Sequence, residues 1–406
     1  MLQHGSVVFL TLTTYQILCT TIYLFMVSFI QTLDITLVLY LVFAILPFIT
    51  HFKINGKIEL IFLSYFLGLL LISIFKNGLS DSISVFVIRY IGIIFGIYFF
   101  MNKKNSEMDN SKLFKEILVA MGCETMIGIL GILISGGGRL MLNYQCTVGN
   151  ISIASILLVA IYMKNTRKNI WLSICFLVYI NFWTIFSGTR AYLIITVILS
   201  LILVFLYSNN VLRTLILCLL ITTIIMFLSS DTLMSLVLKT TRLDESTGRR
   251  SSENLFVLKY MSNFDIRTIF GYGFGTVVGN LPGASNVIAE VSNSEYTNYI
   301  INQVSGFHNF FFTVYYSSGL VGLALTVILF LKLIYVFLKS PISKSSKLYL
   351  IAYIFLYLLL LWYRWSCTSG ILEFALLSYV FNLSKKNELN YFAEERMNVC
   401  EQTISC

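Results

Sequence analysis

The sequence predicts an all-α protein that crosses a membrane many times, and its composition and its apolar segments lead to this fold class. Of its 406 residues, 57% are hydrophobic and 12% are charged, and the mean hydropathy is +0.84. A soluble domain carries roughly 25% charged residues, so this chain has about half the charge that covers a water-soluble surface. Long apolar segments also recur along the chain, with one long polar stretch between them. These features exclude a soluble enzyme, a DNA-binding protein and a disordered chain.

Twelve segments are long and apolar enough, or nearly so, to form transmembrane helices. A spanning helix needs about 20 mostly apolar residues, because lipid offers no partner to its backbone polar groups. The first segment lacks the basic start and the small-residue cleavage site of a signal peptide, so we expect it to be retained. The twelve segments lie at 6–30, 33–49, 58–75, 82–101, 116–135, 148–163, 170–187, 191–207, 214–230, 319–338, 348–363 and 370–383.

The basic residues predict how these helices are oriented. Short cytoplasmic loops carry an excess of Lys and Arg. When alternate connections are assigned to one side, 16 of the 28 basic residues lie on that side and 4 lie in the short loops opposite. Both termini are therefore predicted to face the cytoplasm, and much of the net charge of +9 reflects topology.

This topology divides the chain into four parts. Residues 1–230 hold nine transmembrane helices, 231–306 form a large outer loop, 307–384 hold three more helices, and 385–406 form a cytoplasmic tail. A structureless loop of this length is unusual and is often functional. Within it, a helix is expected to start at 251–253 and to end at the glycine-rich turn 271–275, with one face formed by Leu255, Leu258 and Met261 or Ser262.

Cysteine and histidine patterns indicate no metal site. The eight cysteines show no Cys-x-x-Cys spacing, and several lie inside apolar segments, as small buried hydrophobic residues do. The three histidines form no metal-ligand cluster. Neither a metal nor a cofactor is expected.

Arginines stand at two places on the predicted outer side. Arg190 follows the small residues 187–189, and Arg249 and Arg250 lie at the predicted start of the loop helix. A helix N-terminus presents free backbone N–H groups and the positive end of the helix dipole, so arginines there favour an anion. The same arginines are also typical of interfacial anchors or of ion pairs within the loop, and the residues alone leave both interpretations open.

His308 and Asn309 lie where the long loop returns to the membrane. A histidine has an unperturbed pKa near 6.5 and can accept a proton from a hydroxyl group at neutral pH. A lone histidine is more often a structural hydrogen-bonding residue, so a structural role and a catalytic role both stay open here.

Short motifs lie in order along the predicted outer side. His308 and Asn309 are followed after nine residues by Gly319 and Gly322, which gives H-N-x9-G-x-x-G. The earlier segment 186–191 has the sequence F-S-G-T-R-A and contains Arg190.

Two further motifs lie in the same part of the chain. Gly248 and Arg249 precede the expected helix and the G-Y-G-F-G turn at 271–275, and Arg139 lies in an R-L segment followed by Gly149 and Asn150. From about 138 to 322, the set resembles the superfamily of O-antigen polymerases and O-antigen ligases, which are polytopic membrane glycosyltransferases. The segment with Arg190 resembles the family's T-x-S-R-G segment in loosened form. Arg249 is preferred over Arg250 as the matching arginine because it directly follows the glycine.

The resemblance implies a GT-C-like membrane enzyme that acts on an undecaprenyl-pyrophosphate-linked oligosaccharide at the outer, periplasmic face of the bacterial inner membrane. Direct displacement at the anomeric carbon implies inversion, without a metal. The catalytic residues that the resemblance implies are His308 as the base, with Arg190 and Arg249 at the pyrophosphate, and the substrate-binding residues are Arg139, Arg250 and Asn309.

Polymerase and ligase share this chemistry and differ in the acceptor. The polymerase, which we favour, joins repeat units into O-antigen or capsular polysaccharide, whereas the ligase transfers the glycan to the lipid A core. A flippase for the lipid-linked oligosaccharide is a further alternative, although transporters usually bind at the midplane between repeated halves. The expected partners are the lipid-linked donor and acceptor, membrane lipid and a chain-length regulator protein, and no nucleic acid.

Overall fold

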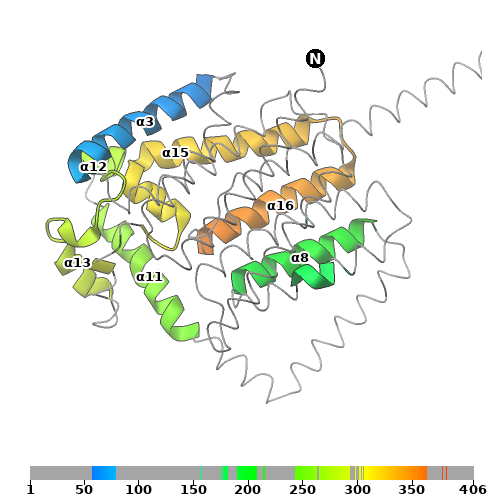
Figure 1. The fold of residues 1–406 in the computed structure, drawn as a ribbon, viewed down its shortest axis with the longest axis horizontal. Coiled ribbons are helices and arrows are strands. Elements are labelled where there is room, and N and C mark those ends of the chain that lie inside the picture. Colours follow the sequence, from blue (N-terminus) through cyan, green and yellow to red (C-terminus); the bar gives the residue numbers. More distant parts are fainter. Residues whose placement is uncertain are drawn as a thin grey trace, which may run out of the picture.

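The structure is a computed structural model, and the elements that it describes are all helices (Figure 1). The described residues are 57–78, 156, 175, 177–181, 190–207, 214, 243–262, 265–292, 298, 301, 302, 304, 306–363, 377 and 381. The expected all-α fold is confirmed for these residues. Three of their helices are long and apolar enough to cross a membrane. The other predicted spans, apart from 191–207, lie wholly or mostly outside the described residues.

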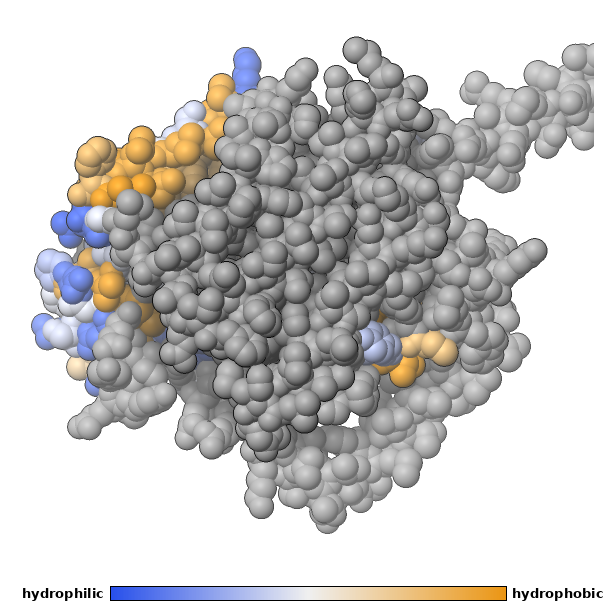
Figure 2. Space-filling model, viewed as in Figure 1, coloured by the Kyte–Doolittle hydropathy of each residue, from blue (hydrophilic) through white to orange (hydrophobic). Residues whose placement is uncertain are grey.

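Three helices match predicted spans to within a few residues. They are α3 (Lys57–Asn77), α8 (Arg190–Tyr207) and α16 (Lys344–Tyr363). Apolar side chains cover α3 on the side away from the other helices (Figure 2), and Phe75 in its last turns is 90% exposed. Such a surface is stable only in apolar surroundings, as expected for a helix in contact with lipid.

A first core joins α16 to its two neighbours. The helix lies between α8 and α15 (Phe310–Lys339), and it packs against both (Figure 1). Tyr349, Tyr353 and Tyr357 repeat every four residues, so they share one face of α16, and all three are buried. From α15, Leu333 and Phe337 enter the same core.

The helix α15 begins nine residues before the span predicted at 319–338 and contains a kink. Asn309 caps its first turn, because its Oδ1 accepts hydrogen bonds from the backbone N–H groups of Phe311 at 2.9 Å and Phe312 at 3.3 Å. Gly319 has φ 65° and ψ −168°, which breaks the helical path. The predicted span therefore corresponds to the part of α15 after the kink.

The glycine-rich turn 271–275 binds the backbone of α15 beside this kink. The N–H groups of Tyr272 and Gly273 donate to the carbonyl oxygens of Tyr316 at 2.9 Å and Ser317 at 3.0 Å. Tyr65 of α3 donates its hydroxyl proton to the carbonyl of Ser318. Backbone carbonyls at a helix break are thus satisfied by segments distant in sequence, as buried polar groups require.

Glycine is required on both sides of this contact. A Cβ on Gly319 would overlap the backbone of residues 269 and 271, and a Cβ on Gly271 would overlap the carbonyl of Ser317. Both glycines also have positive φ angles, of 65° and 82°, which other residues rarely adopt.

The described part of the predicted outer loop is folded. It contains α11 (Leu243–Tyr260), α12 (Ile266–Phe270), the short 3₁₀ helix η2 (Val278–Asn280) and α13 (Ala284–Val291). These elements, the glycine-rich turn 271–275 and the first turns of α15 enclose a second core, and we call the part from α11 to α13, with this turn, the loop layer. The last turn of α3 contacts this layer, because Nδ2 of Asn77 donates a hydrogen bond to the carbonyl of Phe274 at 3.0 Å. The second core includes Phe256, Val257, Met261, Tyr272, Val278, Ile288, Phe307 and Tyr316.

Two expectations for the loop helix, its start and its end, were wrong. It starts at Leu243 rather than at 251–253, and its first turn contains two acidic residues that suit the positive end of the helix dipole. It ends at Tyr260, and α12, capped by Asp265, lies between it and the glycine-rich turn. Leu255 and Leu258 are 44% and 52% exposed, and the aromatic contacts of Phe256 lie on the inward side of the helix.

Replacing Gly319 with alanine tests the contact at the kink. The added methyl group overlaps the turn backbone, and a strained φ costs about 1–3 kcal/mol, so we expect a lower midpoint of thermal unfolding in detergent. Gly68→Ala is the matched control, because this glycine of α3 has open space around it. Alanine favours a helix, so the control is expected to unfold at or above the wild-type temperature. Equal midpoints for both variants would contradict the close contact.

Candidate active site at a glutamate–histidine pair

His308 is bound to a carboxylate from a helix distant in sequence. Its Nδ1 lies 2.9 Å from Oε2 and 3.0 Å from Oε1 of Glu253, and its backbone N–H donates to the same Oε2 at 3.0 Å. The Glu253 side chain is 1% exposed and that of His308 is 32% exposed. The carboxylate therefore holds one edge of the imidazole, while part of the ring is open to a ligand.

The hydrogen bonds select the tautomer of His308. A carboxylate accepts hydrogen bonds, so Nδ1 carries the proton and Nε2 keeps a free electron pair in the neutral ring. The proton is assigned to Nδ1 from the hydrogen-bond partners of the ring. An imidazole held in this way can accept a proton at Nε2, and the carboxylate then stabilises the imidazolium that forms.

Packing fixes the segment that carries His308. Phe307 is buried beside Phe256 and Tyr316, with ring centroids 6.2 and 5.2 Å apart. Its backbone N–H donates to Oγ1 of Thr313 at 2.8 Å. The Asn309 cap follows directly, so the backbone on both sides of His308 is held by the first turn of α15.

Sequence reasoning missed Glu253 as a site residue and treated it only as part of a helix start. A buried carboxylate is costly unless it has hydrogen-bond partners, and His308 supplies two of them. A usable signal was present in the spacing of the apolar residues after Glu253. Apolar residues follow at intervals of three, four, seven and eight, and they are Phe256, Val257, Tyr260 and Met261. A glutamate in register with the apolar face of a helix points into the core.

Asn309, predicted to bind substrate, has a structural role in this geometry. Its Oδ1 is occupied by the helix cap, and the side chain is buried. Its Nδ2 has no hydrogen-bond partner in the part of the chain that the structure describes.

The structure describes the predicted arginines to different extents. Arg250 is half-buried in α11, one helical turn before Glu253. Arg249 lies beside it in the chain, and Arg190 is the first residue of α8, although the described structure does not include the side chains of these two. Arg139 lies outside the described residues. Arg249 and Arg250 lie inside α11, so their expected position at a helix N-terminus was wrong.

Comparison with known proteins identifies no relative of this chain, since no family model and no curated protein matches it. Among the described residues, no group of three or more His, Cys, Asp or Glu side chains is arranged to hold a metal ion. The geometry of the Glu253–His308 pair therefore provides the main structural basis for a function.

Replacing Asn309 with alanine tests whether the cap of α15 holds the segment that carries His308. Loss of an N-cap costs about 0.5–2 kcal/mol, so we expect Asn309→Ala to lower the midpoint of thermal unfolding. Asn309→Ser keeps an oxygen that can accept the same hydrogen bonds, and it should unfold close to the wild-type temperature. An alanine variant as stable as the serine variant would show that the cap does not hold this segment.

Proposed function

We propose that this protein is a membrane glycosyltransferase that polymerises undecaprenyl-pyrophosphate-linked repeat units into O-antigen or capsular polysaccharide. The reaction takes place at the outer face of the bacterial inner membrane. The observation that carries the proposal is the Glu253–His308 pair, in which a buried carboxylate orients a partly open imidazole. The motifs that resemble the O-antigen polymerases supply the substrate class.

In the proposed reaction, Nε2 of His308 accepts the proton of an acceptor hydroxyl group. The hydroxyl oxygen attacks the anomeric carbon of the donor from the side opposite the pyrophosphate. The new glycosidic bond forms as the bond from carbon to pyrophosphate breaks, and the lipid pyrophosphate leaves with the electron pair. Glu253 stabilises the imidazolium until its proton is lost to water. This displacement inverts the configuration at the anomeric carbon.

The leaving lipid pyrophosphate gathers negative charge, so cations fixed near it lower the barrier. Arg190 and Arg249 have this role in the proposal, and Arg139 and Arg250 bind substrate. Guanidinium groups suit it because they bind phosphate oxygens through two parallel hydrogen bonds. The position of Arg250 one turn from Glu253 on α11 supports a cationic site close to the proposed base.

The polymerase is preferred over the ligase because the motifs are loosened, as suits family members that vary with sugar structure. The two are distinguished in cells that lack the protein. A polymerase deletion leaves surface glycans of single repeat units, whereas a ligase deletion leaves polymer on its lipid carrier. A flippase would neither lengthen the glycan nor release lipid pyrophosphate when the purified protein meets lipid-linked repeat units.

Removing the proposed base should stop chain extension. We expect His308→Ala to lower the rate by on the order of 10²–10⁴, the usual contribution of general acid–base catalysis. Glu253→Gln keeps the shape of the partner but removes its charge, so it should also slow the reaction while the protein stays folded. The measurement is glycan length and released lipid pyrophosphate from purified protein. Lys259→Ala is the control, since this exposed residue of α11 pairs with Glu290 at 3.0 Å, and near-normal product from His308→Ala would reject the base.

Changing the arginines to lysine tests the pyrophosphate site. We expect Arg190→Lys and Arg249→Lys to impair chain extension at an unchanged protein level, because a lysine cannot reproduce two parallel hydrogen bonds. Lys259→Arg is the matched control on the surface of α11 and should leave the rate unchanged. Full activity of both lysine variants would exclude these arginines as the pyrophosphate-binding groups.

A further inference from the structure

A cavity of about 490 Å³ lies where the end of α3 meets the loop layer. Its walls come from the last turn of α3, from α12, from the glycine-rich turn and from η2 with the residues after it. Among the lining residues are Lys76, Asn77, Arg267, Tyr272 and Asn280. No residue assigned to the proposed reaction lines the cavity, so it is a separate feature of the molecule.

The charge of the cavity is positive. Lys76 and Arg267 are its only charged lining residues, and neither forms a salt bridge with a carboxylate in the described part of the chain. The Lys76 ammonium donates a hydrogen bond to the carbonyl of Tyr272 at 3.3 Å. The Arg267 guanidinium lies 5.6 Å from the centre of the Tyr272 ring. Both cations thus contact the same residue, and neither is part of a described salt bridge.

Two described groups near these cations differ in their charge. Burial raises the pKa of Tyr272 to about 12, so its phenol stays neutral at physiological pH. Asp265 is the carboxylate close to Arg267, and backbone hydrogen bonds from Thr268 and Arg267 hold its pKa below the usual value. It offsets part of the charge of Arg267, but its Oδ1 is occupied as the cap of α12.

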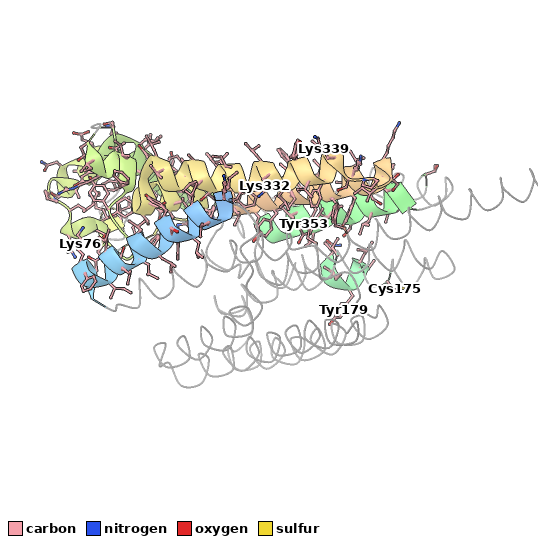
Figure 3. The ribbon with its side chains drawn as sticks, turned by 90° about the horizontal axis from the view of Figure 1, so that it is seen from above. Lys76, Cys175, Tyr179, Lys332, Lys339 and Tyr353 are labelled. Carbon is pink, nitrogen blue, oxygen red and sulfur yellow. The ribbon has the colours of Figure 1, made fainter. Side chains whose placement is uncertain are left out.

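The cavity lies at the level where an apolar span ends. Lys76 is in the last turn of α3, and the candidate span ends at Asn77 (Figure 3). In the turns that lead to Lys76, Leu71, Ile72 and Phe75 expose apolar side chains on the same helix. Lipid phosphate groups lie at this level of a bilayer, directly above the hydrocarbon layer.

We propose that this cavity binds the phosphate monoester of a membrane lipid between Lys76 and Arg267, with the lipid chains along the exposed face of α3. The two cations supply charge-assisted hydrogen bonds to phosphate oxygens, which are strong in a partly dehydrated site. The exposed apolar face of α3 favours a lipid over a free anion as the source of the phosphate.

The cavity is joined to the Glu253–His308 pair through a row of aromatic rings. Tyr272 lines the cavity and stacks on Tyr316 at 5.4 Å, and Tyr316 meets the edge of Phe307 at 5.2 Å. Phe307 immediately precedes His308. A lipid held at the cavity would therefore contact the same packed row that positions His308.

Binding of a short lipid to the full chain in detergent tests the site. The probe is dioctanoyl phosphatidic acid, and dioctanoylglycerol is the matched lipid without phosphate. Native mass spectrometry measures the fraction of protein that carries each lipid. We expect phosphatidic acid to bind, and Lys76→Gln with Arg267→Gln to weaken its affinity by roughly tenfold or more. Lys76→Arg with Arg267→Lys keeps the charges and should retain binding, which excludes a simple folding defect.

A control at another surface lysine separates the site from general attraction of anions. Lys259→Gln removes a positive charge from the loop layer away from the cavity, and it should leave binding unchanged. Equal binding of dioctanoylglycerol, wild-type affinity in the double glutamine variant, or equal weakening by Lys259→Gln would each overturn the proposal. Displacement of the lipid by inorganic phosphate at equal concentration would reject a lipid as the ligand. Because the readout is binding, these outcomes are independent of glycan extension.

Discussion

The contact between the glycine-rich turn and the kinked part of α15 joins the loop layer to the membrane-spanning helices. A helix inside a membrane satisfies its own backbone, and a break in it leaves polar groups that must find other partners. Here those partners are the N–H groups of Tyr272 and Gly273 and the hydroxyl group of Tyr65. The side chains of Ser73 and Asn77 extend the same contact to the backbone of Phe274. One junction thus ties α3, α12 and α15 together.

The candidate site depends on this junction. The first turns of α15 lie between the kink and the Asn309 cap, and they contribute to both cores, with Phe310 and Val314 in the first core and Tyr316 in the second. Tyr316 contacts the glycine-rich turn through its backbone and Phe307 through its ring, so both ends of this segment are fixed by the same residue. Glu253 reaches His308 across 55 residues of sequence, and that approach requires the loop layer to be held against α15.

The sequence predicted the membrane-spanning helices better than the loop layer. Apolar composition over about 20 residues is enough to locate α3 and α16, which are long and apolar enough to cross a membrane, and also the apolar helix α8. The start of α15 was missed because Phe310 to Ser318 belong to a helix whose partners are loop residues rather than lipid. His308 was found through its motif, whereas Glu253 required knowledge of which face of α11 is buried. The apolar residues in register with Glu253 indicate that face, but its contact with Phe307 joins segments that are distant in sequence.

The two glycines of the junction each face the backbone of the other's segment. A Cβ on Gly271 would meet the backbone of Ser317 and Ser318, and a Cβ on Gly319 would meet that of Ile269 and Gly271, so neither position can vary while the other segment stays in place. In an evolving lineage, Gly271 and Gly319 therefore behave as one inherited unit, although 48 positions separate them. A descendant that loses one of them must change the backbone path of both the glycine-rich turn and the kinked helix.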